Sequence, residues 1–280
     1  MKYLTLPSGA QMPAIGLGTY QQLPDYSKSV VDCEIIIKAL KAGFRHIDSA
    51  IFYETHAEIR RALRESGADR SELFITTKVY RNKLGYDDML AECERSLEEL
   101  GTDYLDLYLV HWPNRDIPME ETFRAMGRLI EEGSVRDMGV ANFTRINLRK
   151  ALDASQAPIA INQVEFHPLL YQEKLLHFCE ANGVKVTAYA PIAQALVMDE
   201  PVLQDIGKIH GRSPVQISLR WLLQKGLAAV PKASSEAHLA ANLDLFDWEL
   251  ADEEMQRIDA IGKKQRLFDW EEVGEFSRDV

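Results

Sequence analysis

The stretch HIDSAIFYE, residues 46–54, holds the first clue to both the fold and the site. Asp48 closes a mostly apolar run that is typical of a buried strand, and Tyr53 follows it five residues later. A carboxylate at the end of such a strand is costly to bury without a partner. Asp48 therefore predicts a polar site at the end of this strand, with Tyr53 beside it.

Similar short segments, rich in apolar and β-branched residues, recur along the chain between longer amphipathic ones. The eight strand candidates are AIGLGTY (14–20), FRHIDSA (44–50), LFITTKV (73–79), YLDLYLVHW (104–112), VRDMGVANF (135–143), AINQVEF (160–166), KVTAYAP (185–191) and LAAVPKA (227–233). Strands that are apolar on both faces and joined by helices indicate a parallel sheet. Eight such units in about 250 residues favour a closed (β/α)8 TIM barrel over an open doubly wound sheet.

The segments between the strands complete this α/β organisation. Apolar residues recur at helical spacing, mostly with a glycine at the end, in 29–43, 86–101, 121–133 and 172–183. Residues 2–18 predict an N-terminal β-hairpin around PSG, and 200–212 predict an extra helix near the C-terminus. We find no linker composition and expect a single domain over 1–280; the tail after Gly262 has no clear periodicity.

The composition excludes several classes of function. The 280 residues are 46% hydrophobic, and 32 basic against 43 acidic residues give a net charge of −11, which argues against nucleic acid as a partner. No apolar run approaches the ~18 residues of a membrane span, and the N-terminus lacks a signal-peptide pattern. Three widely spaced cysteines are expected to be reduced, so we expect a cytoplasmic protein.

Polar residues mark the ends of seven of the eight predicted strands. They are Asp48, Lys78, His111, Asn142, Gln163, Tyr189 and Lys232. Each alone has a structural explanation, such as a lysine that extends its charged head into water. Active sites of (β/α)8 barrels lie at the carboxyl ends of the strands, however, so a ring of strands brings these residues to one pocket.

The first three of these positions, together with Tyr53, suggest acid–base chemistry. Asp48 can pair with Lys78 across adjacent strands, and a nearby ammonium lowers the pKa of a tyrosine such as Tyr53 by stabilising its phenolate. Tyr53 can then give a proton to a developing alkoxide, while His111 donates a hydrogen bond to the same carbonyl oxygen.

None of these residues is an obvious nucleophile, so the reaction needs a partner that brings one. A hydride from a nicotinamide would serve. Asn142 and Gln163 are suited to hold its carboxamide, and Tyr189 to stack on its ring. No GxGxxG motif follows any strand, and GLG at 16–18 is too short to count, so binding would differ from that of a Rossmann fold.

The chain resembles the aldo-keto reductase family along essentially its whole length. The motifs that carry this resemblance, in order and spacing, are GFRHIDSAIFY, FITTKV, DLYLVHWP, INQVEFHP, VTAYAP and AVPKASS. The resemblance implies a (β/α)8 barrel with an N-terminal hairpin that binds NADPH in an extended form. It also implies that aldehydes and ketones are reduced through Tyr53, Lys78, Asp48 and His111, by a monomer or a weak oligomer.

The same resemblance assigns the remaining positions. Lys232 would meet the 2′-phosphate and Asn242 the adenine, and aromatic residues would wall a substrate pocket suited to apolar or aromatic carbonyl compounds. The implied cofactor-binding residues are Gly18, Thr19, Tyr20, Asp48, Asn142, Gln163, Tyr189, Ala190, Pro191, Lys232, Ala233, Ser234, His238 and Asn242. The implied substrate-binding residues are Tyr20, Tyr53, Tyr80, His111 and Trp112, and no metal is implied.

The chain departs from the family pattern at several of these positions. Ala141, Ala190 and Ala233 replace common serines, and His238 replaces an arginine six residues after the phosphate-binding lysine. Histidine cannot reproduce the charged guanidinium fork, so we expect weaker 2′-phosphate recognition, partly recovered by Ser234 or Ser235, and some use of NADH. After Tyr53 the family commonly has Asn-Glu, whereas this chain reads ETHAE; THAE, residues 55–58, predicts a helix capping box.

Three other functions compete with this interpretation. A metal-dependent hydrolase could use His46, Asp48, His111 and His167 as ligands, but it leaves Tyr53, Gln163 and Lys232 unexplained. A Schiff-base aldolase could use Lys78, although Asp48 would keep that amine protonated. A non-catalytic, cofactor-sensing subunit would bind NADPH without turnover.

Overall fold

Eight parallel strands form the central sheet of the computed structural model, which describes residues 1–20 and 31–268. Each strand pairs with the next along the chain. Their bounds are β3 (Leu17–Gly18), β4 (His46–Asp48), β5 (Phe74–Val79), β6 (Leu105–Val110), β7 (Val135–Ala141), β8 (Ile159–Glu165), β9 (Lys185–Tyr189) and β10 (Ala228–Ala229). Every predicted strand segment contains the greater part of one of these, and the predicted (β/α)8 fold is confirmed.

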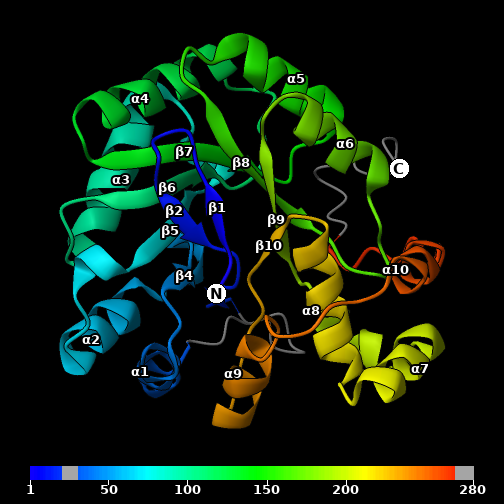
Figure 1. Ribbon diagram of the computed structural model, residues 1–280. Helices are drawn as coiled ribbons and strands as arrows, with labels where there is room; N and C mark the ends of the chain where they lie inside the picture. Colours follow the sequence, from blue (N-terminus) through cyan, green and yellow to red (C-terminus); the bar gives the residue numbers. More distant parts are fainter. Residues whose placement is uncertain (21–30, 269–280) are drawn as a thin grey trace.

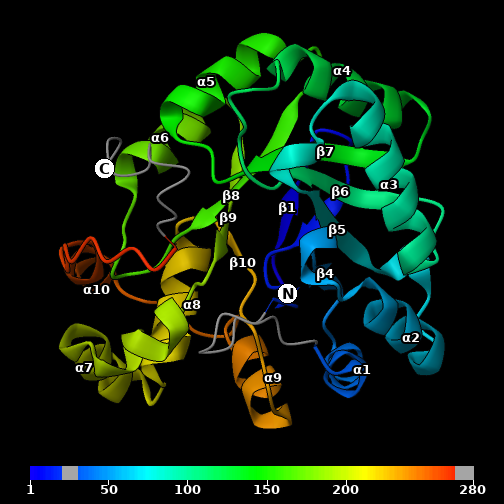
Figure 2. The same ribbon diagram turned by 180° about the vertical axis from the view of Figure 1, so that it is seen from behind.

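Helices surround this sheet on the outside (Figures 1 and 2). The α-helices are α1 (Cys33–Ala42), α2 (His56–Ser66), α3 (Tyr86–Leu100), α4 (Met119–Glu131), α5 (Arg145–Ala154), α6 (Glu173–Ala181), α7 (Pro201–His210), α8 (Pro214–Gln224), α9 (Glu236–Leu243) and α10 (Asp252–Asp259). Short 3-10 turns are η1 (Ile51–Tyr53), η2 (Arg70–Glu72), η3 (Arg81–Lys83) and η4 (Ala193–Asp199). The extra helix predicted over 200–212 is α7.

Local sequence signals explain where the helices begin and end. Ser213 and Gln216 form a reciprocal capping box at the start of α8, with Pro214 at its first position. Helix α1 ends at Gly43, which adopts a left-handed φ of 109° that side chains rarely tolerate. The connections are short, and α3, α4, α6 and α8 each contact a strand that is adjacent to them along the chain.

The ring closes between its first and last strands. Gly16 N donates to Ala229 O at 2.9 Å, and Ala229 N donates to Ala14 O at 2.8 Å. Two residues further along both segments, Gly18 N donates to Pro231 O at 3.1 Å. A Cβ at Gly18 would lie 2.6 Å from Val230 O, so only glycine permits this approach. We call these contacts of residues 14–18 with 229–231 the seam.

The N-terminal hairpin closes one end of the barrel. Strands β1 (Tyr3–Thr5) and β2 (Gln11–Pro13) pair antiparallel around the predicted PSG turn. Leu6 and Met12 of the hairpin are buried in a cluster that includes Phe74 and Ala228, the first residues of their strands. The hairpin thus plugs the amino-terminal end of the barrel and leaves the carboxyl-terminal end for a site.

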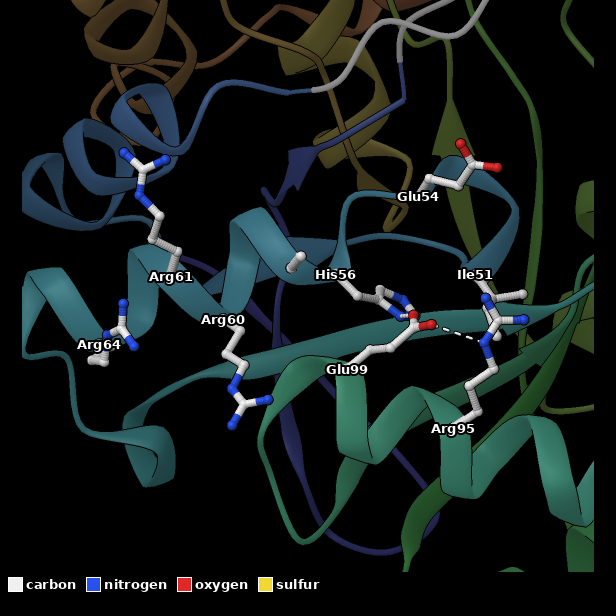
Figure 3. A pocket seen from close by; sticks show the side chains of 9 residues that line it. Ile51, Glu54, His56, Arg60, Arg61, Arg64, Arg95 and Glu99 are labelled. Carbon is white, nitrogen blue, oxygen red and sulfur yellow. Dashed lines mark hydrogen bonds and ion pairs between the residues drawn. The ribbon is translucent and has the colours of Figure 1, made fainter.

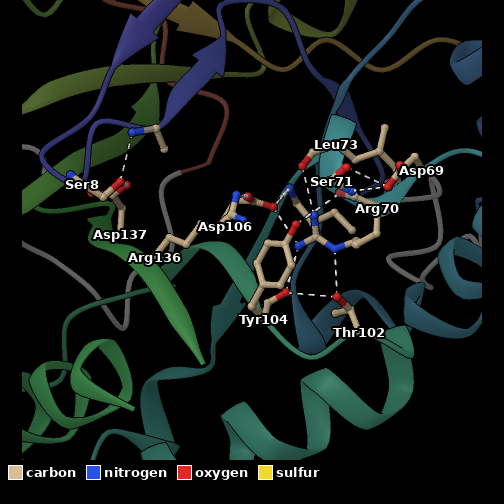
Figure 4. A network of polar contacts seen from close by, with 12 residues as sticks. Ser8, Asp69, Arg70, Ser71, Leu73, Thr102, Tyr104, Asp106, Arg136 and Asp137 are labelled. Carbon is tan, nitrogen blue, oxygen red and sulfur yellow. Dashed lines mark hydrogen bonds and ion pairs between the residues drawn. The ribbon is translucent and has the colours of Figure 1, made fainter. Parts of the chain in front are cut away.

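A polar network reinforces this plugged end (Figure 4). Asp106 is 1% exposed and pairs with Arg70 at 2.7 Å and Arg136 at 2.9 Å, while the Tyr104 ring lies between the two guanidinium groups, 4.0 Å from each. Beside it, the Ser8 hydroxyl and backbone N–H both donate to the buried Asp137 carboxylate. Ser8 therefore ties the hairpin to β7.

Replacing Ser8 with alanine should lower the free energy of unfolding by about 1–3 kcal/mol at pH 7, because it leaves the buried Asp137 carboxylate short of a donor. Burial raises the pKa of Asp137 while the Ser8 hydrogen bonds lower it, so Ser8→Ala raises it further. The folded variant then binds more protons than the unfolded chain above pH 3.8, and its deficit against wild type grows as pH rises from about 4 to 7.

Urea unfolding of wild type and Ser8→Ala at about pH 4 and pH 7 measures this difference in the free energy of unfolding. Thr5→Ala is the matched control, since its hydroxyl contacts exposed Gln11 and should matter by less than about 0.5 kcal/mol. An equal deficit for Ser8→Ala at both pH values would contradict the role of the Asp137 charge.

Two further expectations concern the chain as a whole. Cys33, Cys93 and Cys179 are free, buried thiols, and burial raises the pKa of Cys93 and of Cys179 to about 12. Within residues 1–20 and 31–268, no helix is both long and apolar enough to cross a bilayer.

Candidate active site

An ion pair between Asp48 and Lys78 lies at the carboxyl-terminal end of the barrel. Lys78 Nζ donates to Asp48 Oδ1 at 2.6 Å and to Ser49 O at 2.7 Å. Asp48 is 3% exposed and Lys78 is fully buried. The two residues come from adjacent strands, β4 and β5, so the predicted pairing is confirmed. Each charge offsets the burial penalty of the other.

Tyr53 and His111 lie next to this pair. The Tyr53 hydroxyl is 3.3 Å from His111 Nε2, and Lys78 Nζ is 5.0 Å from the centroid of the Tyr53 ring. His111 directly follows β6, while Tyr53 ends the turn η1 that follows β4. A phenol and an imidazole that converge in this way, with an ammonium beside the phenol, can both donate to one oxygen atom.

The prediction that Lys78 lowers the pKa of Tyr53 is wrong for the chain alone. Burial raises that pKa well above its usual value of 10.0, and the Asp48 carboxylate adds to the effect. The physical reason is that Asp48 neutralises Lys78 at 2.6 Å, so the ammonium acts as one half of an ion pair. Tyr53 therefore holds its proton at neutral pH and can act as a donor.

His111 is neutral in this environment. Burial, followed by the positive charge of Lys78, lowers its pKa well below 6.5. Its Nδ1 atom is buried and has no hydrogen-bond partner among the described residues. An unpaired N–H is costly to bury, whereas Nε2 has the Tyr53 hydroxyl within reach. This asymmetry favours the tautomer with the proton on Nε2.

Amide side chains continue the site around the ring. Gln163 Nε2 donates to the second oxygen of Asp48 at 2.7 Å, which connects β8 with the ion pair. Asn142 Nδ2 donates to His111 O at 2.9 Å, and its Oδ1 accepts from the Tyr189 hydroxyl at 2.7 Å. Asn142 adopts a left-handed φ of 62°, a conformation that asparagine tolerates better than most residues.

Aromatic rings gather around Tyr53 and His111. The rings of Tyr20 and Tyr53 lie 4.7 Å apart, and Phe52 stacks on Tyr80 at 4.7 Å with 10° between their planes. Tyr80 also meets His111 edge-on at 6.2 Å. The structure thus brings Tyr20 and Tyr80 to the proposed reaction centre, while Trp112 is 6% exposed next to His111 in the chain.

The residues that are expected to bind the adenosine part of the cofactor lie after the last strand. Lys232 is half-buried and burial lowers its pKa, whereas Ala233 and Asn242 are buried. Ser235 caps α9 by accepting from His238 N at 3.2 Å, and Ser234 Oγ lies 3.3 Å from His238 Nδ1. This places an exposed histidine, a hydroxyl and a lysine around one helix start.

The remaining cofactor candidates follow the same strands. Thr19 and Pro191 are buried, Gly18 belongs to the seam, and Ala190 has a left-handed φ of 46° directly after Tyr189. Together with Asn142, Gln163, Tyr189 and Lys232 they lie on neighbouring strands, β7 to β10 and β3. Amides, a half-buried ring and a cation in this order fit a nicotinamide nucleotide laid across the mouth of the barrel.

The four candidate metal ligands are not brought to one point. His46 bonds to Pro13 O and Thr76 Oγ1 at the start of β4, the opposite end of that strand from Asp48. His167 pairs with Glu165 at 3.0 Å. In the described part of the chain, no three histidine, cysteine or acidic residues lie close enough to share a metal ion.

Glu165 is a site residue that sequence reasoning missed. It ends β8 fully buried and accepts from the backbone of Leu267 at 2.8 Å and Phe268 at 3.1 Å. The Phe268 ring meets Tyr189 at 5.6 Å. Glu165 thereby attaches part of the C-terminal tail beside the expected nicotinamide position. A carboxylate in the apolar run AINQVEF was the available signal.

A (β/α)8 barrel with polar and aromatic residues concentrated at the carboxyl ends of its strands is an enzyme scaffold. A sequence model described as the Aldo/keto reductase family matches residues 14–263. The chain therefore belongs to the aldo-keto reductase family, a class of oxidoreductases.

Characterised relatives and solved structures agree with this assignment. The chain is 39% identical to glyoxal reductase of Bacillus subtilis (strain 168), over 94% of this chain and 93% of that protein. It is 34% identical to morphine 6-dehydrogenase of Pseudomonas putida, over 94% and 92%. The crystal structure of a Bombyx mori aldo-keto reductase in complex with NADP superposes with a TM-score of 0.89 at 31% identity, covering 98% of this chain and 97% of that one.

Proposed function

We propose that this protein reduces aldehydes and ketones to alcohols with NADPH, and that Tyr53 is the proton donor. The observation that carries the proposal is the contact of the Tyr53 hydroxyl with His111 Nε2 at 3.3 Å, beside the buried Asp48–Lys78 pair. Family membership supports the reaction class, and the relatives that act as reductases support its direction.

Each residue of this cluster has a distinct task in the proposed reaction. When bound, the nicotinamide supplies a hydride to the carbonyl carbon. Tyr53 transfers its phenolic proton to the carbonyl oxygen, so that carbon and oxygen together gain two electrons and two hydrogens. His111, with its proton on Nε2, donates to the same oxygen and orients it. Lys78 stabilises the phenolate that remains, and Asp48 holds Lys78 in place.

The cofactor is held by residues of the second half of the ring. Asn142 and Gln163 bind the carboxamide, Tyr189 stacks on the nicotinamide, and Lys232 meets the 2′-phosphate. The neighbour that contains NADP supports the choice of cofactor. We further propose a single domain that acts as a monomer or weak oligomer in the cytoplasm.

A fluorescence titration with NADPH and, separately, NADH tests the cofactor, and turnover of glyoxal and benzaldehyde tests the reaction. Tighter binding of NADPH together with turnover is the expected result. Binding without turnover of either compound would favour the non-catalytic subunit, and binding of neither cofactor would contradict the proposal. Aromatic residues around Tyr53 lead us to expect better kcat/KM for benzaldehyde than for glyoxal.

His238→Arg should tighten NADPH binding by about 10–150-fold and leave NADH binding unchanged. An arginine adds a charge-assisted hydrogen bond to the 2′-phosphate, worth roughly 1.5–3 kcal/mol, which NADH lacks. His238 is exposed at the start of α9, so the longer side chain meets no packing barrier. The dissociation constants of both cofactors measure the effect, with His238→Gln as the uncharged control. Equal tightening for both cofactors would place residue 238 away from the phosphate.

A further inference from the structure

The catalytic tyrosine stands on a short irregular segment. Tyr53 is the last residue of the 3-10 turn η1, between Ala50 in extended conformation and Glu54 with a left-handed φ of 60°. A single turn of this kind has few backbone hydrogen bonds of its own. The position of the Tyr53 hydroxyl therefore depends on what holds the two ends of the segment 49–56.

Thr55 ties the far end of this segment to the near end. It is fully buried, and its Oγ1 lies 2.8 Å from Ser49 Oγ and 3.2 Å from Thr19 Oγ1. Thr19 Oγ1 in turn donates to Asp48 O at 2.9 Å. Each hydroxyl has one proton, so the bonds run in one direction, from Ser49 to Thr55 to Thr19 to the Asp48 carbonyl.

This arrangement replaces the capping box that THAE predicts. Thr55 is the N-cap of α2, but it has helical backbone angles and makes no side-chain cap hydrogen bond. An N-cap bond is worth about 1 kcal/mol to a helix. The Thr55 hydroxyl thus bonds to Ser49 and Thr19, and α2 forgoes a side-chain cap.

His56 holds the same segment from the outside of the barrel (Figure 3). It is 1% exposed, with Nε2 2.8 Å from Thr77 Oγ1 and Nδ1 3.0 Å from Glu99 Oε2, while Arg95 Nε donates to Glu99 Oε1 at 2.8 Å. The carboxylate places the proton on Nδ1, so Nε2 accepts from Thr77. Thr77 precedes Lys78 on β5, and side chains alternate along a strand, so His56 contacts the outer face at the level of Lys78.

A hollow lies behind the turn. Ile51, Glu54 and His56 line a hollow of about 420 Å³ between α2 and α3, with four arginines around it. Figure 3 shows that these guanidinium groups point in different directions, and Arg61 and Arg95 pair with glutamates of their own helices. Phe52 packs on Tyr80 within the site, while the hydrogen bonds of Thr55 and His56 fix the part of the segment that follows Tyr53.

We propose that Thr55 and His56 are positioning residues that hold the Tyr53 hydroxyl at its working distance from the substrate oxygen. This inference rests on the proposed role of Tyr53 as the proton donor. A displacement of about 1 Å at a reacting group can reduce the rate about a hundredfold. Neither residue touches the reacting atoms; both act through the backbone of residues 50–54.

Thr55→Val tests the inference, because it keeps the shape and removes the hydroxyl. We expect kcat to fall about 10–100-fold with the dissociation constant of NADPH unchanged, and Thr55→Ser to recover most of the loss. Thr122→Val is the matched control. Thr122 lies on α4, and its buried hydroxyl donates to Leu84 O at 2.8 Å. The loss of this bond should lower the stability of the protein and leave kcat unchanged.

A double variant separates positioning from a general loss of structure. If Thr55 acts through Tyr53, adding Thr55→Val to Tyr53→Phe should cause no further loss of the residual turnover. If the double variant loses turnover by the product of the two single-variant losses, the inference is overturned. The same holds if Thr55→Val alone keeps the wild-type kcat. If Thr55→Val does not fold, Ser49→Ala and His56→Leu test the two anchors by the same measurements.

The proposed function can fail separately from this inference. Full turnover by Tyr53→Phe alone would reject the role of Tyr53 and, with it, the inference. An inactive Tyr53→Phe combined with a fully active Thr55→Val, Ser49→Ala and His56→Leu would reject only the inference.

Discussion

Replacing Tyr53 with phenylalanine is expected to lower kcat for carbonyl reduction by about 10²–10⁴-fold, the range of a positioned general acid. The ring remains, so its contacts with Tyr20 and His111 persist and the dissociation constant of NADPH should not change. Because burial and Asp48 raise the pKa of Tyr53, the wild-type phenol stays protonated at neutral pH, and its activity should not fall as pH rises from 6 to 8.

Tyr108→Phe is the matched control for this variant. Tyr108 is also fully buried, but its hydroxyl has no hydrogen-bond partner among the described residues, and its side chain belongs to the core cluster with Cys93 of α3, not to the one with its strand neighbours Leu107 and Leu109. The same chemical change there should leave kcat unaltered. Steady-state kinetics and a fluorescence titration of each variant suffice. Turnover by Tyr53→Phe at the wild-type rate would show that another group supplies the proton.

Replacing Asp48 with asparagine is expected to lower the free energy of unfolding by about 3–5 kcal/mol at pH 7, because it leaves Lys78 buried without its counter-ion. Activity should be lost as well, since Lys78 is then no longer held beside Tyr53. Lys78→Met breaks the same pair from the other side. The double variant should be less destabilised than the sum of the two single variants, as no unpaired charge remains.

The effect of Asp48→Asn should depend on pH. Burial lowers the pKa of Lys78 while Asp48 raises it, so the pKa of Lys78 is lower in the Asp48→Asn variant than in the wild type. The folded variant then binds fewer protons than the unfolded chain between that pKa and the usual 10.5, and its stability rises with pH across this window. Urea unfolding at pH 7 and 9.5 measures this; a deficit that stays constant would mean that the Lys78 charge is not its origin.

The fold and the core of the site could be predicted because they depend on periodicity. A strand that is buried on both faces is recognisable by its composition, and a polar residue at its end can lie only at the mouth of a barrel. Asp48 and Lys78 follow this rule, and their pairing follows from the adjacency of consecutive strands. Tyr53 could be assigned to the same site because it lies only five residues after Asp48 in the sequence.

Other features depend on competition between partners, which a sequence pattern does not reveal. THAE has the residue types of a capping box, but Ser49 and Thr19 lie closer to the Thr55 hydroxyl than the helix does, so the cap does not form. The pKa of Tyr53 depends on its surroundings in the folded chain, where burial raises it most and the Asp48 carboxylate raises it further. Glu165 could not be assigned to the site because the tail residues that it binds, Leu267 and Phe268, lie about a hundred residues later in an aperiodic segment.

Closure of the ring at the seam makes the site a late product of translation. The acid–base residues leave the ribosome in the first half of the chain, but the second strand partner of residues 14–18, which closes the ring, is synthesised only at 229–231. Until then the nascent sheet has two open edges, which are prone to pair with other chains. Contacts between residues so distant in sequence also form slowly. A chain that stalls before residue 229 therefore carries most of the catalytic groups, yet it is an aggregation hazard and a substrate for chaperones or proteases instead of a partly active enzyme.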